Sequence, residues 1–161
     1  MTDVKLVTCI FPEDFDIAKS ITSDYIIWLK MDLSFQNIQK EYAVFESMYS
    51  QPNGGYIYLK KDNQIIGGVA FRNFETAVCE MKRLFIYPEF QSLGFGKILS
   101  LAIIKLAREH GYKKMRLDTV EKLKAAIKIY TALGFYEIEP YRENPDPTAK
   151  FMELNVENFS F

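Results

Sequence analysis

One stretch of the chain constrains its fold most: a strand that stops at a proline and leads into a helix start marked by glycines. The strand covers about Val78 to Tyr87, and Pro88 ends it. The motif Gln91-x-x-Gly94-x-Gly96 follows and opens a helix from about Phe95 to His110. A helix start offers backbone N–H groups without intrahelical partners, and glycine lets an anion approach them closely. The stretch therefore predicts either a pyrophosphate-binding turn or a tight packing contact.

Two common nucleotide-binding motifs do not fit this turn. A dinucleotide-binding turn of the type Gly-x-Gly-x-x-Gly needs a third glycine at position 99, which is Leu99. A Walker A loop needs a serine or threonine after its Gly-Lys pair, and Gly96-Lys97 is followed by Ile98. Neither motif explains the turn.

The rest of the chain reads as alternating strands and helices without a repeat or a linker. Further strands are expected at 4–10, 56–59, 64–71, 114–118, 135–138 and 151–156, and further helices at about 12–28, 35–49 and 123–133. In the first helix the apolar residues at helical spacing should face the core: Phe15, Ala18, Ile21, Tyr25 and Trp28. The first half of the chain predicts antiparallel strands, and the second half follows the order β-α-β-α-β. Together they predict one α/β domain over residues 1–161, with a mixed sheet and helices on both faces.

Two motifs in this order resemble the GCN5-related N-acetyltransferase (GNAT) superfamily. Ile86-Tyr87-Pro88 with Gln91 to Gly96 is similar to the family's acetyl-CoA-binding turn. Leu123-x-x-Ala126-x-x-Ile129-Tyr130-x-x-x-Gly134-Phe135 is similar to its second motif, although the family often has asparagine where Leu123 stands. The resemblance covers about Val78 to Ile138. It implies the acyl-CoA N-acyltransferase fold, with a mostly antiparallel central sheet, and acetyl-CoA as cosubstrate.

The resemblance also implies where acetyl-CoA binds. Backbone groups around Leu84 and Ile86 would pair with the pantetheine arm, N–H groups from Ser92 to Lys97 would hold the pyrophosphate, and Gln91 would shape the loop. The full set implied for the cofactor is Leu84, Phe85, Ile86, Gln91, Ser92, Leu93, Gly94, Phe95, Gly96, Lys97, Ala126 and Tyr130. No metal is expected, since the only histidine, His110, lies at a helix end.

Two residues are candidates for the chemistry of acetyl transfer to an amine. Tyr130 matches the family's general acid for the leaving thiolate, or it is a core tyrosine on an apolar helix stripe. Glu80 matches the base of the histone-modifying members, or it forms an ion pair on the strand surface. Lys82 and Arg83 are nearby, and such cations lower the pKa of a carboxyl group and weaken it as a base. A water relay is the alternative to Glu80.

The acceptor pocket is less defined by the sequence. Lys82, Arg83 and Arg142 together would suit a carboxylate, as on an amino acid, a small acidic amine or a peptide end, unless they are only surface charges. Thr119 would line the cleft or cap the following turn. The acceptor is therefore expected to be a primary amine of a small molecule, amino acid or peptide, attacked in a ternary complex.

Two other functions remain open from the sequence. The first is an acyl-CoA-binding sensor without catalysis. The second is a structural or oligomeric role, because Leu101 and Ile104 interrupt a polar helix face, which suits a homodimer or cover by the N-terminal helices. Twenty basic and twenty-one acidic residues argue against nucleic-acid binding. The sequence shows no signal peptide or long apolar segment, and we expect a cytoplasmic protein that does not bind membranes.

Overall fold

In the computed structural model, which describes residues 3–33 and 37–161, seven strands form one sheet in the order β1-β2-β3-β4-β5-β7-β6. The strands are β1 (Val4–Thr8), β2 (Gly54–Lys61), β3 (Gln64–Glu75), β4 (Val78–Ile86), β5 (Lys114–Thr119), β6 (Tyr136–Ile138) and β7 (Lys150–Asn155). Of the neighbouring pairs, β4 and β5 are parallel and the others are antiparallel. The predicted mixed, mostly antiparallel sheet is confirmed.

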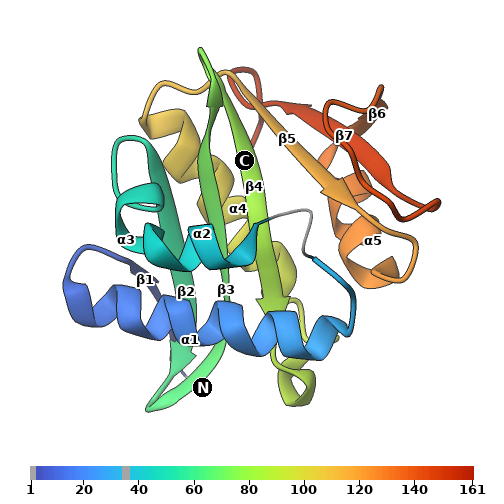
Figure 1. Ribbon diagram of the computed structural model, residues 1–161. Coiled ribbons are helices and arrows are strands. Elements are labelled where there is room, and N and C mark those ends of the chain that lie inside the picture. The colour runs from blue at the N-terminus through green and yellow to red at the C-terminus, as the bar shows by residue number, and fades with distance from the viewer. Residues whose placement is uncertain (1–2, 34–36) are drawn as a thin grey trace.

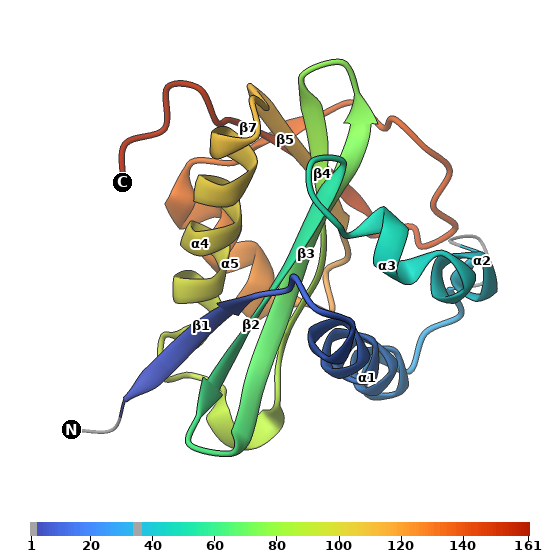
Figure 2. The same cartoon turned by 90° about the vertical axis from the view of Figure 1, so that its left-hand side faces the viewer.

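Helices cover both faces of this sheet, as Figure 2 shows edge-on. They are α1 (Pro12–Leu29), α2 (Ile38–Ala43), α3 (Phe45–Met48), the short 3-10 helix η2 (Pro88–Phe90), α4 (Phe95–Glu109) and α5 (Lys124–Leu133). The N-terminal helices α1, α2 and α3 lie on one face, while α4 and α5 lie on the other (Figure 1). No helix among the described residues is long and apolar enough to cross a membrane.

The first helix begins where the sequence predicts, and four of its five expected core residues are buried. Pro12 starts the helix, and the Asp14 carboxylate accepts hydrogen bonds from the N–H groups of Ile10 and Phe11 at 3.1 Å. The exception is Trp28, which remains 38% exposed although its ring packs 5.5 Å from that of Phe85. The helical spacing placed Trp28 in the core, but it lies at the edge of the apolar stripe.

The expected helix over 35–49 is two short helices, α2 and α3, with a break at Val44, and positions 35 and 36 lie outside the described residues. The interpretation of Leu101 and Ile104 is also corrected. Ile104 is fully buried in the core between α4 and the sheet, and Leu101 is partly buried. The N-terminal helices cover the opposite face, so they do not explain these residues, and Ile104 offers no surface for self-association.

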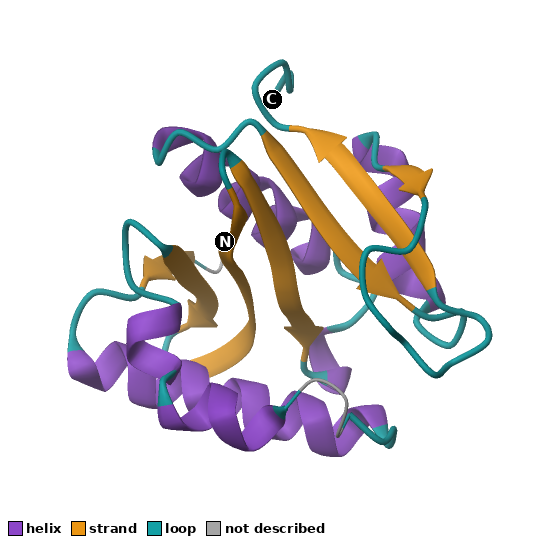
Figure 3. Ribbon diagram, turned by 45° about the horizontal axis from the view of Figure 1, so that its top comes forward, coloured by secondary structure: helices purple, strands orange, loops and turns teal. Residues whose placement is uncertain are grey.

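The feature of the fold that positions the site is the separation of β4 from β5. The two strands pair over Val78, Cys79 and Glu80 and then diverge, which is visible in Figures 1 and 3 as a V-shaped opening. A β-bulge lies just beyond the last pair: the register between β3 and β4 shifts between Gly68 and Ala70, and Arg83 in the bulge has φ 62°. Bulges bend a strand and end its pairing. The bulge therefore turns the second half of β4 away from β5.

Candidate functional site

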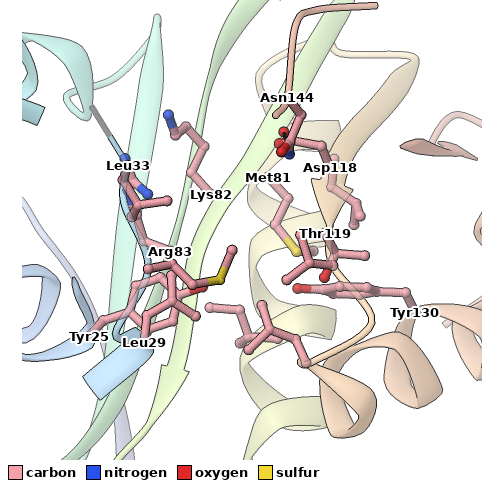
Figure 4. A pocket seen from close by; sticks show the side chains of 15 residues that line it. Tyr25, Leu29, Leu33, Met81, Lys82, Arg83, Asp118, Thr119, Tyr130 and Asn144 are labelled. Atoms are coloured by element: carbon pink, nitrogen blue, oxygen red, sulfur yellow. Dashed lines mark hydrogen bonds between the residues drawn. The ribbon is translucent and has the colours of Figure 1, made fainter. Parts of the chain in front are cut away.

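A cavity occupies the opening between the diverging strands (Figure 4). Residues of β4 and β5 form its two sides, and the end of α1 and the start of the following loop close it on one face. The side chain of Tyr130 enters it from α5 and that of Asn144 from the loop before β7. Of the sequence-predicted residues, those that line the cavity are Lys82, Arg83, Leu84, Thr119 and Tyr130. Glu80 and Arg142 are not among the lining residues.

Tyr130 packs in the core and also lines the cavity, so its position is compatible with either role considered for it from the sequence. Its ring is 7% exposed and packs against Phe135 in the core, with 5.6 Å between ring centroids. Its hydroxyl points into the cavity, and no described residue forms a hydrogen bond with it. Burial, with smaller effects from Tyr25 and Asp118, raises the pKa of Tyr130, so the phenol stays protonated and able to donate.

Thr119 is a buried hydroxyl without a partner. It ends β5, is 5% exposed, and lies beside Tyr130 in the cavity wall (Figure 4). Within the described part of the chain no group pairs with its Oγ1 atom. The alternative that Thr119 caps the following turn is wrong, because its hydroxyl makes no such bond. A buried hydroxyl without a partner is costly, and one that borders a cavity indicates a group supplied from outside the chain.

Glu80 is fully buried and enclosed by cations. Arg72 Nε donates to its Oε1 at 3.0 Å, Tyr141 Oη donates to its Oε2 at 2.8 Å, and Arg142 Nη2 also donates to Oε2. Burial alone would raise the pKa of Glu80, but Lys82, Arg142 and Arg72 outweigh it and hold the pKa below its usual range. Glu80 is not one of the residues that line the cavity. The carboxylate is thus surrounded much as the ion-pair alternative expects.

A second buried carboxylate, Glu41 of α2, holds the bulge of β4 in place. Arg83 donates to it twice, from Nη2 to Oε1 at 2.6 Å and from Nε to Oε2 at 3.1 Å, and Tyr49 Oη donates to Oε2 at 3.0 Å. Burial opposes the charge on Glu41, but the hydrogen bonds and charge of Arg83 outweigh it and lower its pKa. Arg83, predicted as a substrate contact, therefore lies at the cavity with its guanidinium committed to Glu41.

The turn from β4 into α4 is a closed loop that leads into a helix start. Gln91 Nε2 donates to the carbonyl of Ile86 at 2.9 Å and closes the loop. Ser92 and Gly94 have positive φ angles of 66° and 88°, which only glycine adopts without strain. The first α4 hydrogen bond runs from Ile98 N to Gly94 O, which leaves the preceding N–H groups of the helix start directed outward.

Gly96 has a packing reason as well. A Cβ atom on Gly96 would come 2.7 Å from Cδ1 of Ile129 in α5. The missing side chain therefore lets the start of α4 approach α5, so the tight-packing alternative applies to Gly96. Leu93 at the loop tip is 63% exposed. The loop residues from Gln91 to Lys97 do not line the cavity, and they form a separate part of the predicted cofactor site.

The remaining predicted cofactor residues divide between the two faces of the sheet. Phe85 is buried against α1, with its ring 5.4 Å from that of Tyr25. Leu84, Ile86, Phe95 and Ala126 pack against the core on the side of α4 and α5. The side chain of Phe85 is therefore buried away from the opening, and Phe85 can offer a ligand there only its backbone groups.

Sequence reasoning missed two residues at or behind the cavity: Glu41, whose partner Arg83 lies forty-two positions later, and Tyr25, assigned to the core. The prolines of the loop 140–147 predict a stiff surface loop that borders the cleft, and its Asn144 donates from Nδ2 to Asp118 Oδ2 at 3.2 Å. A glutamate on a short polar helix gives no sequence signal for burial. The loop around Asn144 is rich in proline and acids, and its position over β5 depends on tertiary contacts.

Comparisons with known proteins agree with this geometry. A profile of the acetyltransferase (GNAT) family matches residues 22–135. The chain belongs to this family. An uncharacterized N-acetyltransferase of Schizosaccharomyces pombe is 35% identical over 147 residues, which are 90% of this chain and 90% of that protein. The GNAT resemblance, the fold and acetyl-CoA-dependent N-acetyltransferase activity are therefore confirmed, with acetyl-CoA as cosubstrate.

A solved structure and a further curated protein are also similar to this chain. The solved structure of yncA from Salmonella typhimurium with its cofactor acetyl-CoA has a TM-score of 0.68 and 15% identity, covering 98% of this chain and 96% of that one. It shares the fold. The N-acetylaspartate synthetase of Rattus norvegicus is 26% identical over 132 residues, which are 81% of this chain and 43% of that protein.

Proposed function

We propose that this GNAT enzyme transfers the acetyl group of acetyl-CoA to a primary amine of a small molecule, amino acid or peptide by direct attack in a ternary complex. The observation that carries the proposal is the opening between β4 and β5, with the Tyr130 hydroxyl directed into it. A N-acetylaspartate synthetase among the relatives supports an amino acid as acceptor.

The residues present fit acetyl-CoA at both ends of this opening. Beyond Glu80 the edge of β4 has no strand partner on the side of β5 among the described residues, so its backbone groups suit a pantetheine arm as an added strand. The N–H groups at the start of α4 suit the pyrophosphate. The unpartnered Thr119 hydroxyl lies where the thioester end would reach the cavity. Acetyl-CoA supplies an activated acetyl group with a thiolate as leaving group.

Within this geometry we assign Tyr130 as the general acid. Its raised pKa keeps the proton on the phenol until a thiolate develops beside it, and a positioned proton donor contributes about 10²–10⁴-fold to a rate. The backbone N–H groups of β4 after the bulge would stabilise the oxyanion, since that edge of β4 has no strand partner on the side of β5 among the described residues. The surroundings of Glu80 favour a water relay over direct proton abstraction by Glu80, because its lowered pKa and three hydrogen bonds leave it a weak base.

The test begins with calorimetric titration of the protein with acetyl-CoA, followed by thiol release against a panel of amines. We expect saturable binding and thiol release with at least one amine. Tyr130→Phe should lower turnover about 100-fold or more while the affinity for acetyl-CoA stays unchanged. Tyr136→Phe is the matched control, since Tyr136 is 46% exposed in β6, outside the cavity. Unchanged turnover in Tyr130→Phe would remove the acid role, and binding without thiol release from any amine would remove the transfer.

A further inference from the structure

Near the cavity, buried and partly buried cations on and around β4 outnumber the carboxylates that they contact. Two carboxylates, Glu41 and Glu80, contact four cations on β3, β4 and the loop before β7: Arg72, Lys82, Arg83 and Arg142. The guanidinium of Arg83 is hydrogen-bonded to Glu41, and those of Arg72 and Arg142 to Glu80. Three of the four cations therefore already have close carboxylate partners.

Lys82 is the cation with the most distant carboxylate partner. Its nearest carboxylate oxygen is Glu41 Oε1 at 3.7 Å, and Lys82 forms no hydrogen bond with any residue in the described ranges 3–33 and 37–161. The residue is only 9% exposed, yet it lines the cavity, and Figure 4 shows its nitrogen beyond the side chains of Met81 and Arg83. Burial, then Arg83, lowers the pKa of Lys82 to about 8 against the opposing effect of Glu41 and Glu80. The ammonium group is largely intact at neutral pH, and its only close carboxylate among the described residues, Glu41, is shared with Arg83.

An acidic group lies across the cavity from Lys82. Asp118, near the end of β5, accepts a hydrogen bond from Asn144 through Oδ2, while its Oδ1 has no hydrogen-bond partner among the described residues. Figure 4 shows Lys82 extending from β4, with Asp118 of β5 on the opposite side and Asn144 of the loop before β7 beside it. Lys82 and the carboxylate of Asp118 thus lie on facing walls of the cavity, while Arg83, the other cation of the lining, is hydrogen-bonded to Glu41.

We propose that the acceptor is an amine that also carries a carboxylate, of the α-amino acid type, and that Lys82 binds this carboxylate while Asp118 faces the amino group. The inference rests on the proposed acetyl transfer and names the substrate class of the same cavity. Opposite charges on facing walls match a zwitterion, since each charge of the ligand then meets its opposite. The ammonium group of Lys82 forms no hydrogen bond with Glu41 at 3.7 Å, so it can donate to one further carboxylate.

The experiment separates acceptor binding from turnover. N-acetyl amino acids, the products of the transfer, are titrated calorimetrically into the CoA-saturated protein, each paired with its neutral carboxamide. The wild type is compared with Lys82→Met, which keeps the length of the side chain and removes the charge, and with Lys82→Arg, which keeps the charge. Lys105→Met on the exposed face of α4 is the control, because it removes a lysine far from the cavity lining.

We expect at least one N-acetyl amino acid to bind the wild type about tenfold or more tightly than its carboxamide, as a hydrogen bond to a charged group provides. Lys82→Met should abolish that preference with unchanged CoA affinity, while Lys105→Met retains it and Lys82→Arg retains part of it. Equal binding of carboxylate and carboxamide by the wild type, or a preference that survives in folded Lys82→Met, overturns the inference. Thiol release is measured separately, so absence of transfer with a retained carboxylate preference contradicts only the proposed function.

Discussion

Replacing Glu41 with glutamine removes the charge that faces Arg83 behind the bulge of β4. Glu41 is 3% exposed and Arg83 is 7% exposed, so solvent screens their interaction little. Removing one partner of a buried ion pair costs about 3–5 kcal/mol, because the other charge stays buried without compensation. The glutamine oxygen still accepts one hydrogen bond, which places Glu41→Gln at the lower end, about 3 kcal/mol.

Thermal unfolding followed by circular dichroism measures this change. For a chain of this size each kcal/mol shifts Tm by about 2–4 °C, so Glu41→Gln should lower Tm by about 6–12 °C at pH 7. Glu46→Gln is the matched control, since Glu46 lies exposed on α3 and should change stability by less than about 0.5 kcal/mol. The double variant Glu41→Leu with Arg83→Met should recover part of the loss, because it removes the buried charge of Arg83, although Lys82 then loses its contact with Glu41.

The pH dependence of stability gives a second test of the Glu41–Arg83 ion pair. The pKa of Glu41 is lowered in the folded protein from its ordinary value of 4.5. Its stabilising charge is therefore fully present above pH 4.5 and is lost as pH falls through the lowered pKa. The difference between wild type and Glu41→Gln should shrink in that acidic range. A fall in Tm of less than about 2 °C at pH 7, or a difference that grows on acidification, would refute the reasoning.

Three further predictions concern the site. If a water relay removes the proton from the amine, Glu80→Gln should leave the acidic limb of the pH–rate profile in place. Loss of that limb in Glu80→Gln would restore Glu80 as the base. Gly96→Ala should weaken acetyl-CoA binding because its Cβ meets Ile129 Cδ1 at 2.7 Å; Ile129→Val removes that methyl and should restore binding, and failure to do so contradicts the packing account. The KM of a carboxylate acceptor should rise above pH 8 as Lys82 loses its proton, whereas that of the matching carboxamide should not, and parallel curves would exclude Lys82.

Much of the fold follows from local sequence patterns. Pro12 with acidic residues starts α1, Pro88 ends β4, and the glycines at 94 and 134 mark a helix start and a helix end where φ is positive. These signals act over a few residues, so the strands and helices of the second half were predicted close to their observed bounds. The location of the protein in the cytoplasm stays a prediction.

The parts that escaped prediction depend on contacts between distant residues. The bulge at Arg83 is stabilised by Glu41 of α2, and no pattern within β4 indicates a positive φ for an arginine. The enclosure of Glu80 requires Tyr141 and Arg142, which approach from a loop more than sixty positions later. Nearby cations suggested a lowered pKa for Glu80, but only the folded chain shows how many donors surround it.

The short pairing of β4 with β5 has a consequence for the motions of the protein. Three paired positions join the two halves of the sheet, and beyond Glu80 the contact of α4 with α5 also connects them. Amide hydrogens along the edge of β4 that faces the opening should exchange with deuterium faster than those shared with β3. A bound pantetheine arm would bridge that edge, slow its exchange and raise the free energy of unfolding by about 2.7 kcal/mol at a hundredfold excess over Kd. The cosubstrate then acts as the strand that unites the two halves of the sheet.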